Sequence, residues 1–135
     1  MTISTIIPDE YLDLLSDSTK AFAYLATIMP DGSPQVTPVW FNTDEKYILI
    51  NSAAGRVKDR NMRAFPRVSI AISDPQNPYR YIQIRGRVAE IQTEGGREHI
   101  NTLSEKYRGN PVYDGPPSDQ RVIYKILPEK SSGMG

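Results

Sequence analysis

Hydrophobic and polar residues alternate in short stretches along this chain, and turns rich in proline, glycine and aspartate separate these stretches. Alternation over about four to eight residues is typical of a strand with one buried face. Between the first two stretches, Pro30-Asp31-Gly32-Ser33 supplies the backbone angles that a hairpin reversal needs. The pattern predicts six strands, over residues 21–29, 35–41, 46–51, 67–73, 79–91 and 121–127.

Three other segments carry their hydrophobic residues at helical spacing. A short helix is expected to begin at Pro8, because proline and the acidic residues after it suit the first turn of a helix. A second helix is expected over residues 56–65, behind Gly55 and ended by Pro66. A third is expected over residues 93–107, where the apolar side chains share one face.

The length of 135 residues suits a single domain. So small a β-protein gains from closing its antiparallel sheet, because closure removes exposed strand edges. Gly86 interrupts the fifth predicted strand and is expected to mark a bulge or a barrel corner. We therefore predict a mainly β, six-stranded antiparallel barrel over residues 20–128, with a helical cap over 1–19 and a flexible tail over 129–135.

Residue usage excludes several kinds of site. The chain has no cysteine, which rules out disulfides, thiolate nucleophiles, iron–sulfur clusters and cysteine zinc sites. Its single histidine, His99, is too little for a His-rich metal site, and we expect it to face solvent or to pack the third helix. No bound metal is expected. Because no apolar run approaches the roughly 20 residues of a membrane-spanning helix and no signal peptide is apparent, we expect a cytoplasmic protein without a membrane partner.

The chain is neutral overall, but its charge is unevenly distributed. Residues 1–45 have a net charge of −6, whereas residues 56–108 have one of +5. A nucleic-acid-binding barrel would combine this basic region with Tyr24, Tyr79 and Tyr81 as stacking groups, but such domains usually carry a net positive charge. We therefore favour a compact anionic ligand and expect no nucleic-acid partner. The basic side chains are densest at Arg56, Lys58, Arg60, Arg63 and Arg67.

The junction between the third strand and the second helix has the chemistry of a phosphate site. Ser52 offers a hydroxyl, and the backbone N–H groups of the helix start add further donors. Lys58 adds a cation, and Arg56 and Arg60 would lie four residues apart on one helix face, where both can reach one anion. The alternative is an ordinary solvated helix face, which is our interpretation of Arg63 and of Arg67 beyond it.

Residues 37–40, Thr-Pro-Val-Trp, form a second candidate stretch. Apolar alternation by itself places this stretch in the core, and a tryptophan is more often a packing residue than a ligand contact. Pro38 cannot donate to a strand ladder, so it marks a strand edge or an irregularity where a flat ring can approach the backbone. Tyr79 and Tyr81 share a strand face and would cover either a substrate or the barrel surface.

Three segments, in this order, carry a resemblance to a known family: FAYLATIMPDGSPQVTPVWF, YILINSAAGRVKDRNMRAFPRVSIAISDP and IQIRGRVAEI. The chain resembles the pyridoxamine-phosphate-oxidase-like split β-barrels, most closely the flavin/deazaflavin oxidoreductases that use the deazaflavin cofactor F420. The similarity covers residues 21–127, and its most specific piece is the GRVKDRN of residues 55–61. The resemblance implies a split β-barrel that forms a homodimer with two equivalent cofactor clefts between its subunits.

In similar proteins the segment matching residues 52–61 holds the cofactor phosphate and its acidic tail, and the segment matching residues 36–40 runs beside the ring. Substrate contacts are expected from Trp40 and Tyr79, and no catalytic residue is assigned. The candidate cofactor-binding residues are Val36, Thr37, Pro38, Val39, Asn51, Ser52, Arg56, Lys58, Arg60 and Asn61.

The function implied is hydride transfer between F420 and a small unsaturated substrate, such as an activated alkene or an imine. Because such a cofactor carries the hydride chemistry itself, the protein needs no catalytic triad. More cations are present than one phosphate needs, which favours the polyacidic tail of F420 over FMN, the alternative cofactor. A non-catalytic protein that binds a flavin, deazaflavin or similar pigment is the alternative class of function.

Overall fold

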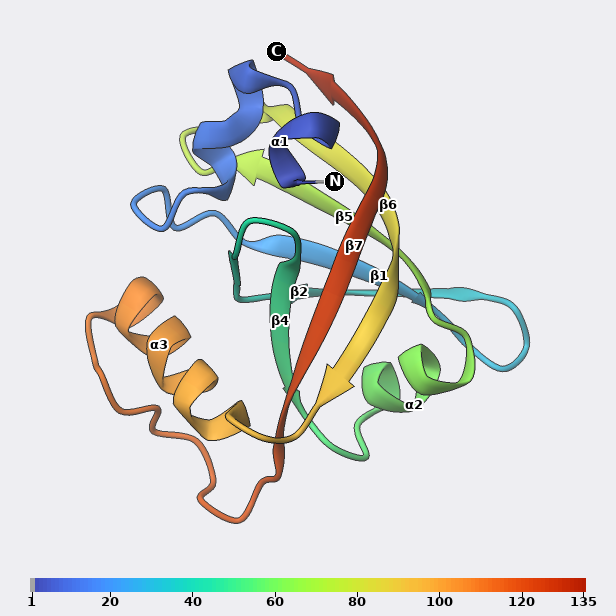
Figure 1. Cartoon of the computed structure of the whole chain (residues 1–135), viewed down its shortest axis with the longest axis vertical. Coiled ribbons are helices and arrows are strands. Elements are labelled where there is room, and N and C mark those ends of the chain that lie inside the picture. The colour runs from blue at the N-terminus through green and yellow to red at the C-terminus, as the bar shows by residue number, and fades with distance from the viewer. Residues whose placement is uncertain (1) are drawn as a thin grey trace.

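The computed structural model describes residues 2–135, and Figure 1 shows their path. The mainly β class is confirmed, and a short additional helix precedes the predicted ones. The helical elements are α1 (Ile3–Ile6), the 3-10 helix η1 (Asp9–Leu15), α2 (Val57–Ala64) and α3 (Gly96–Arg108). The strands are β1 (Ala23–Ile28), β2 (Pro34–Val39), β3 (Phe41–Thr43), β4 (Ile48–Ala53), β5 (Arg67–Asp74), β6 (Asn77–Gln92) and β7 (Arg121–Met134).

The strands form one antiparallel sheet in the order β2-β1-β5-β6-β7-β4-β3, which curls into a half-barrel (Figure 1). The sheet has seven strands rather than the predicted six, because the stretch 35–41 divides at Trp40. Residues up to Val39 pair with β1, whereas Phe41 pairs with Ile50 of β4. The division places β2 and β3 at opposite edges of the sheet, so Pro38 does lie on an edge strand as its chemistry predicted.

The two longest strands, β6 and β7, pair along most of their length. Their register shifts beside Gly86, where an added Cβ would lie 2.2 Å from the carbonyl oxygen of Leu127. The predicted bulge is therefore confirmed, and its cause is the close approach of the two backbones. The expected flexible tail is wrong: β7 continues to Met134 and pairs with Tyr81, and the Ser131 hydroxyl donates to the Ile6 carbonyl. This polar end lacks alternation, but the long β6 supplies its backbone partners.

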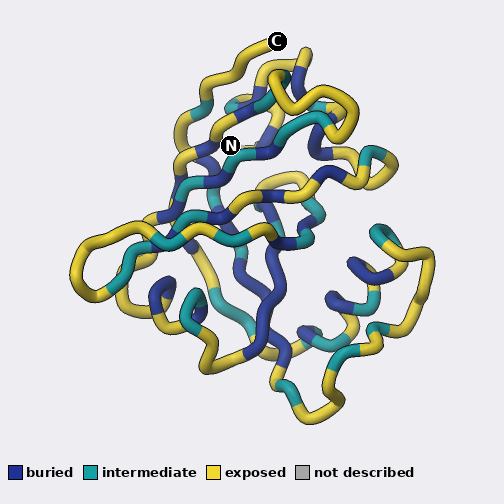
Figure 2. Tube along the Cα trace, turned by 180° about the vertical axis from the view of Figure 1, so that it is seen from behind, coloured by how far each residue is buried: buried dark blue, intermediate teal, exposed yellow. Residues whose placement is uncertain are grey.

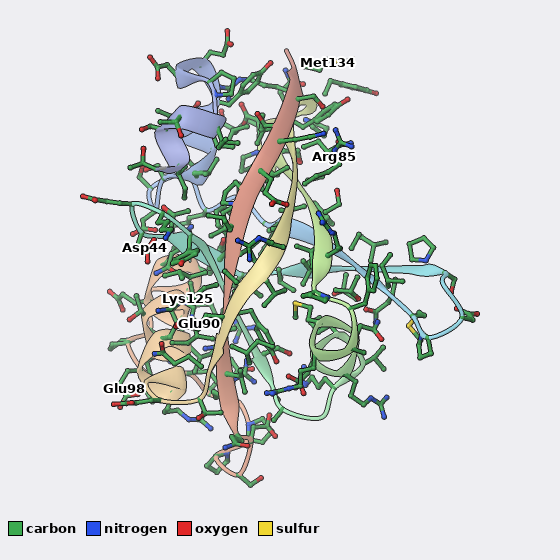
Figure 3. The ribbon with its side chains drawn as sticks, turned by 45° about the vertical axis from the view of Figure 1, so that its right-hand side comes forward. Asp44, Arg85, Glu90, Glu98, Lys125 and Met134 are labelled. Atoms are coloured by element: carbon green, nitrogen blue, oxygen red, sulfur yellow. The ribbon has the colours of Figure 1, made fainter. Side chains whose placement is uncertain are left out.

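A single hydrophobic core fills the concave side of the sheet. Figure 2 shows the buried positions concentrated along the strands, while the β1–β2 turn is exposed. Segments α1 and η1 cover one end through contacts with β5, β6 and β7, α2 packs against β1, and α3 packs against β4 and β7. On the outer surface Lys125 and Glu90 form an ion pair of 2.9 Å between β7 and β6 (Figure 3). Within residues 2–135, every helix is too short or too polar to cross a membrane.

Candidate functional site

A cavity of about 460 Å³ lies where the ends of β2 and β4, the start of α2 and the helix α3 meet. One part of its lining is aromatic or apolar and the other part is cationic. This combination suits a ligand that has both a flat apolar body and an anionic group. The lining residues are Phe22, Tyr24, Pro38, Val39, Trp40, Asn51, Ser52, Arg56, Lys58, Ile100, Arg108, Tyr113 and Arg121.

The turn between β4 and α2 sets the position of Arg56 and Lys58. Gly55 has a φ of +89°, a value that side-chain-bearing residues rarely adopt, so glycine is required there. Arg56 is the N-cap of α2 and has an extended backbone, and no side chain caps this helix end. The first N–H groups of α2 lack acceptors within the helix and add partial positive charge beside the two cations.

The buried carboxylate of Asp59 holds this turn from behind. Its Oδ2 accepts the Gly55 N–H at 2.9 Å, and its Oδ1 accepts bonds from Arg63 Nε and the Tyr124 hydroxyl. Burial opposes ionisation of Asp59, but these hydrogen bonds outweigh it and hold the pKa of the carboxyl below its usual value. Burial and the neighbouring carboxylate in turn raise the pKa of Tyr124. We call Gly55, Asp59, Arg63 and Tyr124 the Asp59 cluster.

A second buried network, the Arg121 cluster, consists of Asn42, Asn51, His99 and Arg121. Arg121 Nε donates to Asn51 Oδ1 at 2.9 Å, and Asn51 Nδ2 donates to the Gly96 carbonyl at 2.9 Å and to His99 Nδ1 at 3.1 Å. His99 Nε2 donates to Asn42 Oδ1 at 2.8 Å. This pattern requires neutral His99, and burial lowers the pKa of His99 to about 4. His99 is thus a packing residue of α3, the second of the two positions expected for it, and does not face solvent.

Two lining residues carry buried side-chain atoms that have no hydrogen-bond partner among residues 2–135: Ser52 Oγ and Arg121 Nη1. Buried polar atoms are nearly always paired, so an unpaired one beside a cavity indicates a place for a ligand. The cations at this end of the cavity also lie close together. Burial first, and then the positive charges of Arg56 and Arg121, lower the pKa of Lys58. An anion at this end of the cavity would relieve both conditions.

The apolar wall is an aromatic stack. The Tyr107 ring lies between those of Phe22 and Trp40, with centroids 5.4 and 5.3 Å away and nearly parallel planes. Tyr113 meets Trp40 edge-on, and the Arg108 guanidinium lies 5.1 Å from the Trp40 ring centroid. The stack fixes Trp40 in place, so this wall offers a preformed surface to a flat ring.

Seven of the predicted site residues line this one cavity: Pro38, Val39, Trp40, Asn51, Ser52, Arg56 and Lys58. Val36 and Thr37 lie on β2 outside the lining, with Val36 63% exposed. Tyr79 is 81% exposed near the β5–β6 turn and does not line the cavity.

Arg60 and Asn61 also lie outside the cavity. Because Arg56 caps α2 and has a non-helical backbone, the expected pairing of Arg56 and Arg60 on one face does not form. Arg60 lines a separate hollow beneath the β1–β2 turn. Asn61 is buried beside it, where its amide nitrogen donates to Thr27 Oγ1 and contacts the Met29 sulfur.

Sequence patterns offer little sign of the remaining lining residues, which come from β1 and the residue before it, from α3 and the loop after it, and from the start of β7. Arg121 had one signal, since it opens an otherwise largely apolar strand, but its partner Asn51 is 70 residues away. Asp59 is the single acidic residue within the basic stretch 56–67. Its position alone does not predict that its carboxylate holds the turn before α2. Within residues 2–135, no three histidine or acidic side chains gather as metal ligands would.

Comparisons with known proteins show relatives of this chain that share its fold. Residues 7–135 match the model of a family described as pyridoxamine 5'-phosphate oxidase. A solved structure described as an F420 reductase is 35% identical, with a TM-score of 0.82 over 93% of this chain and 98% of that chain. A conserved hypothetical protein from Mycobacterium tuberculosis is 25% identical, with a TM-score of 0.72 over 99% and 89% of the two chains. A pyridoxamine 5'-phosphate oxidase candidate from Listeria innocua shares the fold at 23% identity and a TM-score of 0.69, over 93% and 95%.

Proposed function

This chain belongs to the pyridoxamine 5'-phosphate oxidase-like family, and we propose that it is an oxidoreductase that uses the deazaflavin F420. The observation that carries the proposal is the joining of a preformed aromatic wall to a crowded cationic end within one cavity. The 35% identity to the F420 reductase supports it further. FMN, which has the same ring shape and a shorter anionic tail, is the alternative cofactor.

Different residues of the cavity bind different parts of the cofactor. Lys58, Arg56 and the N–H groups at the start of α2 bind the phosphate and the acidic tail. Pro38, on the edge strand β2, leaves the backbone open to a flat ring, and Trp40 limits the depth of the ring. The number of cations exceeds the need of a single phosphate, which supports the longer tail of F420.

When held by Lys58, Arg56 and the start of α2, the reduced form of F420 would supply the hydride chemistry needed to reduce an activated alkene or imine. The protein orients the ring and the substrate and excludes water from the aromatic side of the cavity. Within residues 2–135 no aspartate, glutamate or histidine lines the cavity, and the hydroxyl of Tyr107 behind its aromatic wall is engaged: it donates to the Ala21 carbonyl, and burial raises its pKa to about 12. We therefore assign the proton that completes the reduction to solvent.

We propose further that the protein works as a homodimer whose partner subunit closes the open side of the cavity. Tyr24 and Val36, 43% and 63% exposed, lie on one face of the β1–β2 hairpin at the sheet edge. Exposed apolar side chains beside a cavity suit a protein interface. Sedimentation velocity of wild type and Val36→Asp tests this, and a monomeric wild type would contradict it.

Fluorescence titration of the purified protein with F420 and with FMN tests the cofactor. We expect tighter binding of F420, and Lys58→Ala should weaken it by about 1.5–3 kcal/mol because a charge-assisted phosphate contact is lost. Lys46→Ala, at an exposed position outside the cavity, is the matched control and should bind as the wild type does. An equal loss of affinity in both variants would contradict the role assigned to Lys58. Tighter binding of FMN than of F420 would make FMN the cofactor.

Turnover is tested separately, by following the absorbance of reduced F420 in the presence of an activated alkene such as cyclohex-2-enone. Oxidation of the cofactor that depends on both the protein and the alkene supports an oxidoreductase. Tight binding without turnover across alkene and imine acceptors would favour a carrier of the cofactor instead.

A further inference from the structure

The loop between α3 and β7, residues 109–120, brings a carboxylate to the cationic end of the cavity. Asp119 Oδ2 lies 3.7 Å from Arg56 Nη2 and 3.7 Å from Arg121 Nη1. Both separations are longer than a hydrogen bond, and Oδ2 and Nη1 are buried without any other partner. Asp119 therefore balances the charge of the two guanidinium groups but leaves the Arg121 Nη1 donor unused.

Arg121 is held as a fixed donor. Its side chain is only 5% exposed, its Nε is bonded to Asn51, and Asn51 is itself held by His99 and the Gly96 carbonyl. The Tyr113 ring lies over the guanidinium at 5.1 Å. An arginine anchored through Nε keeps its two terminal nitrogens free for an anion, at little further loss of side-chain entropy.

The loop that carries Asp119 and Tyr113 is attached mainly by polar contacts from α3. Arg97 Nη2 donates to the Asp119 carbonyl at 2.8 Å, and Asn101 Oδ1 accepts the Tyr113 N–H at 2.8 Å. Most residues of the loop are exposed, so it buries little apolar surface. Segments of this kind move at a small cost in free energy, without disturbing the core.

We propose that Arg121 is a buried oxyanion-binding residue of this cavity, and that Asp119 occupies the position which a ligand phosphate takes on binding. The inference rests on the proposed cofactor site and deepens it, because Arg56 and Lys58 lie nearer the surface. A phosphate has several anionic oxygens, so it bonds to Arg121 while still contacting Arg56. Asp119 then swings toward solvent with its loop.

Two ligand pairs are compared: FMN against riboflavin isolates the phosphate, and F420 against its tail-free deazaflavin core removes the phosphate together with the acidic tail. Arg121→Gln should weaken FMN or F420 roughly 10- to 100-fold and leave the phosphate-free partner unchanged. Asp119→Asn should strengthen the phosphorylated ligand roughly 3- to 10-fold, because it removes a competing negative charge. Arg87→Gln, an exposed arginine paired with Glu129 outside the cavity, is the control and should change neither ligand.

The opposite signs of these effects separate a ligand role from a structural one. An Arg121 that only supports the fold predicts that Arg121→Gln weakens both members of a pair equally and that Asp119→Asn gives no gain. Either result would overturn the inference while leaving the cofactor site in place. Circular dichroism and the melting temperature of each variant identify any loss of folding, and if Arg121→Gln unfolds, the Asp119→Asn result decides.

A further experiment uses inorganic phosphate in place of a flavin or deazaflavin, so it tests the inference independently of the proposed function. Inorganic phosphate at millimolar concentration should raise the melting temperature of the wild type, more so that of Asp119→Asn, and not that of Arg121→Gln. If no flavin or deazaflavin binds the wild type, the proposed function fails, and this phosphate response alone supports the oxyanion site. A phosphate response that is equal in the wild type and Arg121→Gln overturns it.

Discussion

The Asp59 cluster and the Arg121 cluster both connect β7 to neighbouring elements, yet they treat buried charge in different ways. Tyr124 and Arg121 lie three residues apart on β7, so their side chains point to opposite faces of the sheet. The Asp59 carboxylate receives three hydrogen bonds, whereas Arg121 keeps one terminal nitrogen unbonded. A saturated buried charge is typical of structural support, and an unsaturated one beside a cavity indicates binding.

Removing the saturated charge should have the largest effect on stability. Asp59→Ala leaves the buried Tyr124 hydroxyl without an acceptor and removes the acceptors of the Gly55 N–H and Arg63 Nε, so we expect a loss of about 3–5 kcal/mol in the free energy of unfolding. Urea denaturation measures it. A loss below about 1 kcal/mol would show that the cluster does not support the turn, and the comparison of the two clusters would fail.

Acid should act on the other cluster through His99. The pKa of His99 is about 4 in the folded protein, below its unfolded value, so between about pH 6.5 and 4 the unfolded state takes a proton that the folded state refuses. Stability should therefore be unaffected above about pH 7 and fall by about 2.5 kcal/mol by pH 4.5. Urea denaturation across this range measures it. His99→Gln removes the titrating group, and a pH dependence that survives in this variant would assign it to the carboxylates instead.

A single donor can be deleted from the Asp59 cluster. Tyr124→Phe leaves the carboxylate with two donors, so we expect a loss of about 1.5 kcal/mol, smaller than that of Asp59→Ala. The pKa of Asp59 should rise because a stabilising bond is lost, and NMR titration of the carboxyl measures this change. An unchanged pKa would mean that the Tyr124 hydroxyl does not stabilise the ionised form.

The smallest effect on stability is expected at the mouth of the cavity. The Arg56 side chain is 53% exposed and lies 3.7 Å from Asp119, so Arg56→Gln should change stability by at most about 0.5 kcal/mol. Thermal unfolding checks this, with Arg67→Gln as an exposed control outside the cavity that also loses an ion pair. A loss above about 1 kcal/mol would make Arg56 a structural residue and erase the difference between the two clusters.

Local patterns predicted most of the fold and about half of the site. The alternating stretches became strands, Gly86 marks a bulge, and the turn at Gly55 brings Ser52, Arg56 and Lys58 together. The expected pairing of Arg56 and Arg60 failed because helical spacing was applied beyond the end of the helix. The helix face that was to join Arg56 and Arg60 required both to be helical, and only the structure shows that Arg56 is the cap.

The sequence by itself determined the class of fold, the cationic turn and the edge character of Pro38, because strand alternation, glycine turns and proline chemistry act over a few residues. Only the tertiary structure decided that Arg121, Asn51 and His99 form one network, and that Asp119 stands between Arg56 and Arg121. These partners are brought together by strand pairing and helix packing between distant segments. Whether a buried polar atom is satisfied depends on all of its neighbours at once.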